Sequence, residues 1–269
     1  ANGILRRKLA PNQRRPLLMP SDSPVDFGLR KVSPQEKRRL VGGVFERVAT
    51  RYDIMNDLMS LGTHRIFKRM LVEMSGVRSG QKVLDLAGGT GDLSALFAPV
   101  VGPEGSVVLA DINPAMMSVG RDRLLDAGLP QVNLCQTCAE SLPFASASFN
   151  CVVIGFGLRN FTDKEAALRE LVRILVPDGV LLVLEFSKPE NPALETAYKA
   201  FQALWPGMGK LVAGDAGSYQ YLLESIRVHP NQQALKLMME DAGFTQVEYH
   251  NFAGGIAAVH RGVRPRDEA

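Results

Sequence analysis

The sequence predicts an α/β fold, a doubly wound and mostly parallel sheet, from three observations. Short apolar runs alternate with amphipathic stretches from residue 82 to residue 186, as strands and helices do in a parallel sheet. A glycine-rich loop directly follows the first apolar run. Two β-type runs near the end of the chain are linked by Gly254-Gly255, which predicts a C-terminal antiparallel hairpin at one edge of the sheet.

N-terminal helices are predicted to precede the sheet. Ser33, Pro34 and Glu36 form a capping box with proline in the first helical position, and apolar residues then recur on one face to about Ala49. A second helix is predicted over residues 65–74. We expect residues 31–75 to form a helical lid. Residues 1–30 contain four prolines and no periodicity, so we expect a mostly disordered basic tail.

The alternation gives the central elements in order. Strands are expected over residues 82–87, 106–111, 132–136, 150–155 and 180–186, and helices over 91–101, 114–127 and 162–175. Residues 231–242 read as a helix, and the closing hairpin comprises 245–252 and 256–261. Residues 193–230 do not fit the alternation and are expected to be a helical insertion or a cap. The result is one domain over 31–262, followed by a tail over 263–269.

Composition limits the function classes. The 269 residues contain no apolar run of about eighteen, so no membrane-spanning helix is predicted, although peripheral attachment stays open. The net charge of +3 includes five basic residues and no acid within residues 1–20, which leaves the rest near −2 and argues against nucleic acid as a partner. The basic start fits a disordered tail, a targeting remnant or an anionic-lipid contact.

The three cysteines predict no metal centre and no disulfide framework. Cys135 and Cys138 make a C-x-x-C, but no second Cys or His pair stands at metal-binding spacing. Both lie in or just after an apolar run, so we expect buried free thiols. No metal is expected.

The glycine loop predicts a ligand. Gly88-Gly89-Thr90-Gly91 stands between a strand and a helix, where backbone N–H groups face a ligand. Asp85 precedes the loop inside the strand, and Asp111 ends the next strand, where an acid can accept the hydroxyls of a ribose. A dinucleotide and S-adenosylmethionine both suit this topology. Asp92 beside the loop would repel a pyrophosphate and favour a ligand with a sulfonium and an ammonium group.

The chain resembles a known family in this loop and in four further segments. The loop is similar to motif I of class I methyltransferases, and residues 27–69, with Tyr52-Asp53-Ile54-Met55-Asn56 at their centre, resemble UbiE/MenG-type ubiquinone and menaquinone biosynthesis C-methyltransferases. Phe156-Gly157-Leu158-Arg159-Asn160, Leu184-Glu185-Phe186-Ser187-Lys188-Pro189 and Tyr219-Gln220-Tyr221-Leu222-Leu223 agree with it. The resemblance covers about residues 27–262.

The resemblance implies that S-adenosylmethionine is held at Thr90, Asp111, the pair Cys138-Ala139 and Gly155. With the loop residues Asp85, Gly88, Gly89 and Gly91, and with Ile112 beside Asp111, they make up the predicted cofactor site. This sequence departs from the family pattern at several places. Phe67 stands where the family usually has Trp, Cys138 where it has Asn, and Gly155 where it has Ser. Val176-Pro177-Asp178-Gly179 replaces Lys-Pro-Gly-Gly.

The implied reaction is methylation of a ring carbon on a polyprenylated benzoquinol, a demethylmenaquinol or both. Only the reduced ring is electron-rich enough to act as nucleophile. Arg159 is expected to stabilise a developing phenolate and Asn160 to hold the second quinol oxygen. Tyr52 and His64 belong to the polar set in the lid, and His64 is a candidate base because its unperturbed pKa lies near neutrality.

A polyprenyl quinol is insoluble in water, so we expect peripheral membrane contact or membership of a quinone-biosynthesis complex. The 193–230 insertion would accommodate the tail. The expected location is cytoplasmic at the inner membrane in a bacterium, or the matrix face of the inner membrane in a eukaryote, and a homodimer stays open. Two alternatives remain from the residues alone: an NAD-dependent oxidoreductase and a non-catalytic S-adenosylmethionine-binding scaffold subunit.

Overall fold

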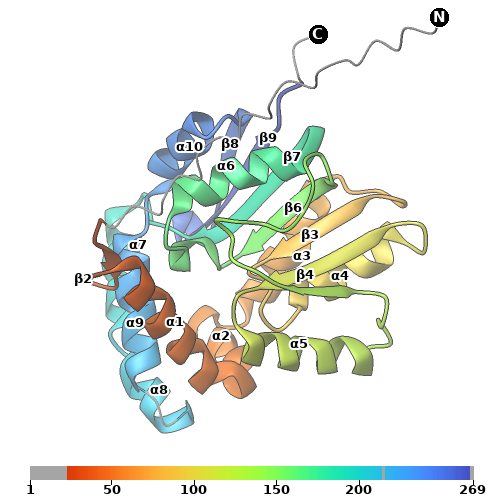
Figure 1. Ribbon diagram of the computed structural model, residues 1–269. Coiled ribbons are helices and arrows are strands. Elements are labelled where there is room, and N and C mark those ends of the chain that lie inside the picture. The colour runs from red at the N-terminus through yellow and green to blue at the C-terminus, as the bar shows by residue number, and fades with distance from the viewer. Residues whose placement is uncertain (1–22, 214–215, 267–269) are drawn as a thin grey trace, which may run out of the picture.

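A computed structural model describes residues 23–213 and 216–266, and its centre is a seven-stranded sheet (Figure 1). The strand order is β5-β4-β3-β6-β7-β9-β8. The strands are β3 (Lys82–Leu86), β4 (Ser106–Asp111), β5 (Asn133–Gln136), β6 (Phe149–Gly155), β7 (Leu175–Phe186), β8 (Thr245–Phe252) and β9 (Ala257–Val263). β3 to β7 pair in parallel, and β9 runs antiparallel to both β7 and β8. The predicted parallel sheet with a C-terminal hairpin edge is confirmed.

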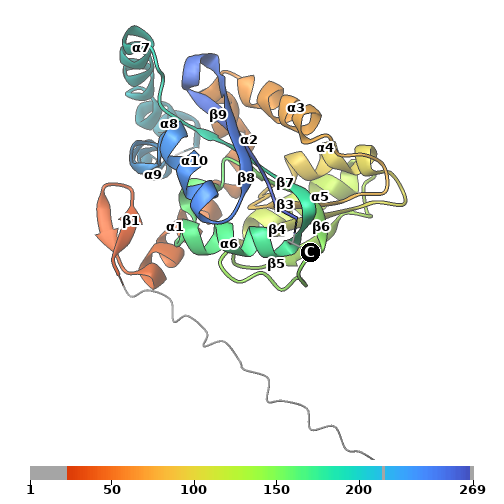
Figure 2. The ribbon, with the colours of Figure 1, turned by 90° about the horizontal axis from the view of Figure 1, so that it is seen from above.

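Helices cover both faces of this sheet. α3 (Thr63–Ser75), α4 (Asp92–Val101) and α5 (Pro114–Asp126) lie on one face, and α6 (Lys164–Ile174) and α10 (Gln232–Asp241) on the other (Figure 2). Side chains of a strand point alternately to the two faces. Accordingly, Val83 of β3 packs in one apolar cluster, whereas Leu84 and Leu86 pack in the other. This explains why the strands read as nearly continuous apolar runs.

The strand order reverses between β3 and β6. From β3 the chain continues outward to β4 and β5 on one side, and it returns to β6 and β7 on the other. In open α/β sheets, ligands bind outside the carboxyl ends of the strands at such a switch point. The glycine loop after β3 and the 156–160 turn after β6 both lie there.

The N-terminal helices differ in part from the prediction. α1 (Pro34–Val48) begins as expected, because the Ser33 hydroxyl accepts a hydrogen bond from the Glu36 N–H at 3.2 Å. A 3₁₀ turn (Ala49–Arg51) leads into α2 (Tyr52–Ser60), a helix that the sequence pattern did not predict. Residues at positive φ, Leu61 and Gly62, separate α2 from α3. α3 packs on α4 and β7 and so belongs to the cover of the sheet, which leaves α1 and α2 as the part of residues 31–75 that could form the predicted lid.

The expectation that residues 1–30 are irregular is wrong for its last part. β1 (Val25–Phe27) and β2 (Arg30–Val32) form an antiparallel hairpin, and Gly28 supplies the positive φ in its turn. The hairpin is held by tertiary contact, since the Phe27 ring stacks on Tyr221 with centroids 4.5 Å apart. Strands of three residues carry no readable periodicity. The remainder of the expected tail, residues 1–22, lies outside the described residues.

The insertion is helical, as predicted. It consists of α7 (Pro192–Gln202), α8 (Trp205–Ala213) and α9 (Ala216–Val228), and α9 packs against α1 and β1. The domain also extends past residue 262, because Arg264 donates its N–H to the Gly179 carbonyl. Residues 267–269 of the expected C-terminal tail lie outside the described residues. None of the described helices has the length and apolarity that a bilayer span requires.

Candidate active site

A pocket lies at the switch point, between the carboxyl ends of β3, β4 and β6 and the helix α1. It encloses about 790 Å³, including open solvent at its mouth. Six of the residues predicted from the sequence line it: Gly89, Asp111, Ile112, Ala139, Tyr52 and Asn160. The other eight predicted residues do not line it.

The glycine loop is shaped by the carboxylate beneath it. Asp85 is buried, and one of its oxygens accepts from the Ser94 N–H at 2.9 Å and the Ser94 hydroxyl at 2.7 Å. A side chain at Gly88 would place its Cβ 2.9 Å from the Asp85 carboxyl carbon, so only glycine fits there. Gly91 has a φ of +84° and its N–H bonds the Gly88 carbonyl, which closes the turn. Asp85, Gly88 and Gly91 thus shape the loop, Thr90 is buried in it, and Gly89 alone of residues 88–91 lines the pocket.

The second oxygen of Asp85 has no hydrogen-bond partner among the described residues. Burial raises the pKa of this carboxyl to about 6, despite the two hydrogen bonds from Ser94. A buried acceptor without a donor is costly unless a ligand or water supplies one. The end of β3 beneath the loop therefore carries an acceptor that no described donor uses.

Asp111 is the acid at the floor of the pocket. Its oxygens accept from the N–H groups of Gly89 at 2.9 Å and Asn113 at 2.8 Å, which fix the carboxylate in position. Burial raises its pKa, although these backbone hydrogen bonds oppose the shift. A carboxylate has about four lone-pair sites, more than these backbone donors occupy, so it can still accept from a hydroxyl of a ligand. Ile112 beside it is 48% exposed and offers an apolar wall.

Glu140 is a second acid in the pocket that the sequence analysis missed. Its carboxylate accepts from the Thr162 N–H at 2.9 Å and from the Cys138 thiol. Burial raises the pKa of Cys138, and this bond to Glu140 adds to the increase. Cys138, expected at the ligand, therefore holds Glu140, whereas Ala139 lines the pocket. Cys138 and Cys135 are half-buried free thiols and not fully buried as expected.

Asp92 does not have the selective role that the loop sequence suggested. Its carboxylate forms ion pairs with Lys68 at 2.7 Å and Arg123 at 2.9 Å, and it does not line the pocket. Two cations neutralise the charge that was expected to repel a pyrophosphate. The acids that line the pocket are Asp111 and Glu140.

Gly155, another predicted contact, is set by packing and not by the pocket. A Cβ on this residue would lie 2.8 Å from Cδ1 of Leu93 in α4. A serine at this position would require Leu93 to move. Packing against Leu93 of α4 therefore favours glycine at position 155, where the family usually has serine.

Helix α1 forms one wall of the pocket. Val41, Gly42 and Phe45 line it, and no sequence motif singled them out. The helix is tied to the sheet by Asn113, whose side-chain amide donates to the Gly42 carbonyl at 3.1 Å. Gly42 has no atom within 4 Å of the place where a Cβ would stand, so the helix leaves open space on this face.

The sequence profile of the ubiE/COQ5 methyltransferase family matches residues 31–264. The chain belongs to this family. It is 56% identical over 241 residues to the ubiquinone/menaquinone biosynthesis C-methyltransferase UbiE of Pseudomonas paraeruginosa, an alignment that covers 89% of this chain and 94% of that protein. It is 53% identical over 249 residues to UbiE of Saccharophagus degradans, covering 92% of this chain and 100% of the relative.

Solved structures support the same fold. The putative methyltransferase in complex with the Haloferax volcanii Trm112 activator superposes with a TM-score of 0.61 at 17% identity, covering 84% of this chain and 97% of that one. A methyltransferase from Aquifex aeolicus gives 0.56 at 15% identity over 87% and 99%. Membership of the ubiE/COQ5 family makes the chain a methyltransferase, and the oxidoreductase that the glycine loop left open is set aside.

The structure separates the four predicted catalytic residues of this ubiE/COQ5 member. Tyr52 and Asn160 line the pocket, and the side-chain amide oxygen of Asn160 accepts from the Tyr221 hydroxyl at 2.9 Å. His64 is buried, bonds the Ser60 hydroxyl at 2.8 Å and does not line the pocket. Burial lowers its pKa, and its place away from the pocket lining gives no support to the predicted role as a base.

Arg159 is also buried away from the pocket lining. Its guanidinium forms an ion pair with Glu185 of β7 at 2.8 Å and also donates to the Phe156 carbonyl. The Glu185 carboxylate in turn accepts from the Arg159 N–H at 3.2 Å. The pair therefore pins both ends of the 156–160 turn that carries Asn160.

Proposed function

We propose that this ubiE/COQ5 family member transfers a methyl group from S-adenosylmethionine to a ring carbon of a polyprenylated benzoquinol, a demethylmenaquinol or both. The observation that carries the proposal is the pocket, which joins the predicted cofactor residues Gly89, Asp111 and Ile112 with the predicted substrate residues Tyr52 and Asn160. The relatives are named for ubiquinone and menaquinone biosynthesis.

The residues present fit S-adenosylmethionine. Asp111 has lone pairs left for ribose hydroxyls, and Ile112 and Ala139 offer apolar surface for an adenine. Asp111 and Glu140 give the lining two negative charges against the one positive charge of Arg38, which favours a cationic ligand. When bound, S-adenosylmethionine supplies an electrophilic methyl group.

The chain's own contribution is to position the quinol and exclude water. Methyl transfer is an in-line displacement, so alignment of the ring carbon accounts for much of the rate. The side-chain NH2 group of Asn160 can donate to a quinol oxygen while its side-chain oxygen still accepts from the Tyr221 hydroxyl. Tyr52 and Phe45 of the lid shield the opposite side of the pocket. Arg159 acts one step away, because it holds the turn that presents Asn160.

The test is a methylation assay on the purified full chain. S-adenosylmethionine and a reduced, demethylated benzoquinol or naphthoquinol with a short isoprenoid tail are mixed in detergent, and the product mass is measured. We expect the quinol to gain one methyl group in place of a ring hydrogen, which leaves as a proton, and the oxidised quinone to gain none; NMR of the product distinguishes a methyl group on carbon from one on oxygen. Cofactor binding without any product from either ring would support a scaffold subunit and refute the proposal.

A further inference from the structure

A second groove lies on the far side of α1 from the active-site pocket. It encloses about 870 Å³, open solvent included, between α1, α9 and the β1–β2 hairpin. Its floor is apolar and consists of Phe27, Leu40, Val44 and Tyr221. The Phe27 and Tyr221 rings stack on one another, and three of these side chains belong to a small apolar cluster separate from the main core.

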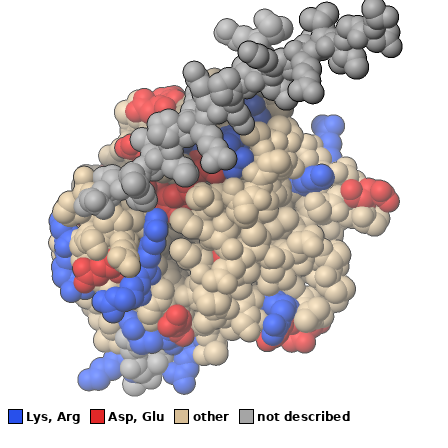
Figure 3. All heavy atoms as spheres, in the orientation of Figure 1, with Lys and Arg blue, Asp and Glu red and all other residues tan. Residues whose placement is uncertain are grey.

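The rim of the groove is basic. Arg30, Arg39 and Arg47 are exposed there, and neither Arg30 nor Arg39 has an ion-pair partner among the described residues. Glu224 is the one acid that lines the groove, and its carboxylate already accepts from the Gln220 amide at 2.8 Å and the Leu29 N–H at 3.3 Å. Figure 3 shows Lys and Arg gathered on the side of the molecule where α1 and β2 lie.

An apolar residue projects beside this rim. Leu29 stands at the tip of the β1–β2 hairpin and is 62% exposed. The tip is fixed, because the Leu29 N–H bonds Glu224 and because a Cβ on Gly28 would collide with that same side chain. Arg30 follows directly and lies over the Phe27 ring at 5.2 Å. An exposed Leu next to a cation is suited to an interface between water and lipid.

We propose that the groove and the hairpin tip dock this protein on a bilayer through an anionic phospholipid. The arginine rim binds the phosphate, the apolar floor takes the first part of an acyl chain, and Leu29 enters the interface. The negative phosphate complements the net positive rim, and the hydrocarbon of the acyl chain complements the apolar floor. A nucleic acid would match the charge of the rim but leave the aliphatic side chains of Leu40, Val44 and the exposed Leu29 without a partner.

The docking site adjoins the active site. Gly42 and Gly43 stand side by side in α1, and the first lines the active-site pocket while the second lines the groove. Tyr221 forms part of the groove floor, and its hydroxyl bonds Asn160 in the pocket. A bilayer bound here would deliver lipid-soluble molecules beside the pocket. The docking itself involves no methyl transfer, so it can fail or succeed independently of the proposed function.

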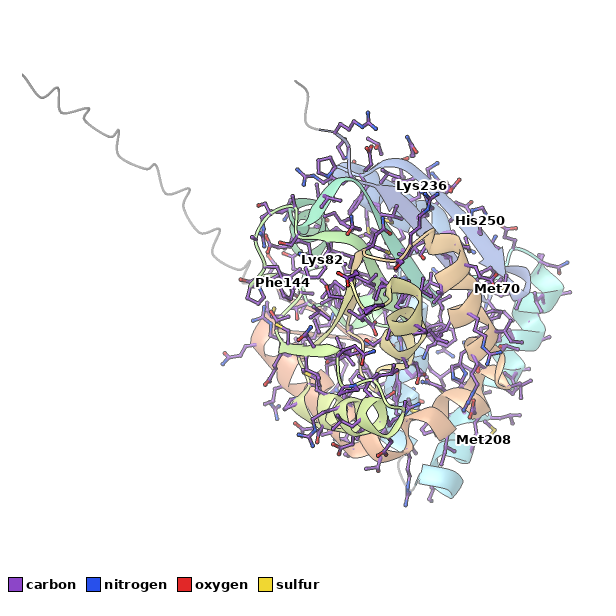
Figure 4. All side chains as sticks on the ribbon, turned by 90° about the vertical axis from the view of Figure 1, so that its right-hand side faces the viewer. Met70, Lys82, Phe144, Met208, Lys236 and His250 are labelled. Atoms are coloured by element: carbon purple, nitrogen blue, oxygen red, sulfur yellow. The ribbon has the colours of Figure 1, made fainter. Side chains whose placement is uncertain are left out.

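The test is vesicle flotation of the full chain. Vesicles of phosphatidylcholine alone are compared with vesicles of equal parts phosphatidylcholine and phosphatidylglycerol, at physiological salt. The variant Arg30→Gln/Arg39→Gln removes two rim charges, and the control Lys82→Gln/Lys236→Gln removes two charges from β3 and α10, which do not contribute to the groove (Figure 4). Thermal unfolding of each variant checks its fold.

We expect the wild type to prefer the anionic vesicles. At about 1 kcal/mol for each basic residue near the surface, the rim variant should bind them about 30-fold more weakly. The control should stay within about twofold, because salt screens distant charges. Leu29→Ser should also weaken binding, by about tenfold, with an unchanged dependence on salt.

Three results would overturn the proposal. Equal binding by the rim variant and the wild type would place the attachment elsewhere, such as the basic residues 6–15 that all variants share. Equal binding of the wild type to neutral and anionic vesicles would refute an anionic ligand. Displacement from anionic vesicles by a single-stranded RNA oligonucleotide, with tighter binding to it, would identify the rim as a nucleic-acid site.

Discussion

Asp111 combines a fixed geometry with spare hydrogen-bonding capacity. The N–H groups of Gly89 and Asn113 hold its two oxygens, so the carboxylate is oriented before any ligand arrives. Preorganisation of this kind lowers the entropic cost of binding a ligand. The same two bonds connect the glycine loop to the start of α5.

Replacement of Asp111 by Ala should therefore abolish S-adenosylmethionine binding. The variant loses the acceptor for ribose hydroxyls and the anchor of the loop, which together should weaken affinity by at least about 100-fold. Asp122→Ala is the matched control, since Asp122 is exposed and its one ion-pair partner among the described residues is the neighbouring Arg121. Isothermal titration calorimetry measures both, and retained affinity in Asp111→Ala would exclude it from the cofactor site.

The Arg159–Glu185 pair predicts a loss of stability as well as turnover. Both side chains are almost fully buried, so Arg159→Ala leaves an uncompensated carboxylate that should cost about 3–5 kcal/mol of unfolding free energy. Urea denaturation measures this loss, and the methylation assay measures turnover.

A double variant separates stability from positioning. Arg159→Met/Glu185→Met removes both charges and keeps apolar volume, so it should recover most of the lost stability. Turnover should remain low, because the Phe156 carbonyl loses its donor and Asn160 is no longer held. Recovery of turnover in the double variant would show that Arg159 has no positioning role.

At the scale of elements, α1 is a helix with two glycines at its middle. Glycine costs roughly 1 kcal/mol relative to alanine in a helix interior, and no packing contact in the structure requires Gly42. Gly42→Ala and Gly43→Ala should each stabilise the protein by about 0.5–1 kcal/mol. Only Gly42→Ala puts a methyl group into the active-site pocket.

We therefore expect Gly42→Ala to weaken S-adenosylmethionine or quinol binding while Gly43→Ala leaves both unchanged. Calorimetry and KM measurements on the two variants compare neighbouring positions with the same chemical change. Equal effects on binding would mean that the helix backbone, and not the space beside Gly42, governs the pocket.

Elements with a long, two-faced apolar pattern could be predicted from the sequence, and short ones could not. The strand over 106–111 was predicted with its observed bounds, because Val107 and Leu109 pack on one face and Ala110 on the other. α2 has nine residues between a 3₁₀ turn and Leu61 at positive φ, so its polar stretch gave no clear period. The β1–β2 hairpin depends on Tyr221, a contact about 190 residues away that no local pattern reveals.

The site was predictable where backbone geometry fixes it. The loop and Asp111 follow from strand, turn and helix spacing. The places of Arg159 and His64 depend on partners in other elements, Glu185 and Ser60, which bury them away from the pocket. Glu140 was missed because a single acid after a strand is common in sequences. Only the folded chain brings it to Cys138 and Thr162.

On the scale of the whole molecule, buried histidines make stability depend on pH. Burial lowers the pKa of His260 to about 4, against the hydrogen bond to the Gln232 carbonyl, and burial also lowers the pKa of His229 well below its usual value. Between the folded and unfolded pKa values of His260 the unfolded chain binds more protons, so the contribution of His260 to stability rises with pH from about 4 to about 6.5 and is constant above. Asp85 and Asp111, with raised pKa values, oppose this trend.

The variant His260→Gln isolates one histidine from this balance. Relative to its own value at pH 7, the unfolding free energy at pH 4.5 should fall less in His260→Gln than in the wild type, by on the order of 2 kcal/mol. Urea denaturation at several pH values gives both curves. Parallel curves would show that His260 already carries its proton in the folded protein.

Tyr221 joins two ligand surfaces through one side chain. Its ring lies in the floor of the basic groove, stacked on the hairpin, and its hydroxyl holds Asn160 in the pocket. Free energies of binding are reciprocal: if a lipid in the groove tightens quinol binding by some factor, the quinol must tighten lipid binding by the same factor. The enzyme would then stay longest on membranes that hold its substrate and leave those where the supply is exhausted.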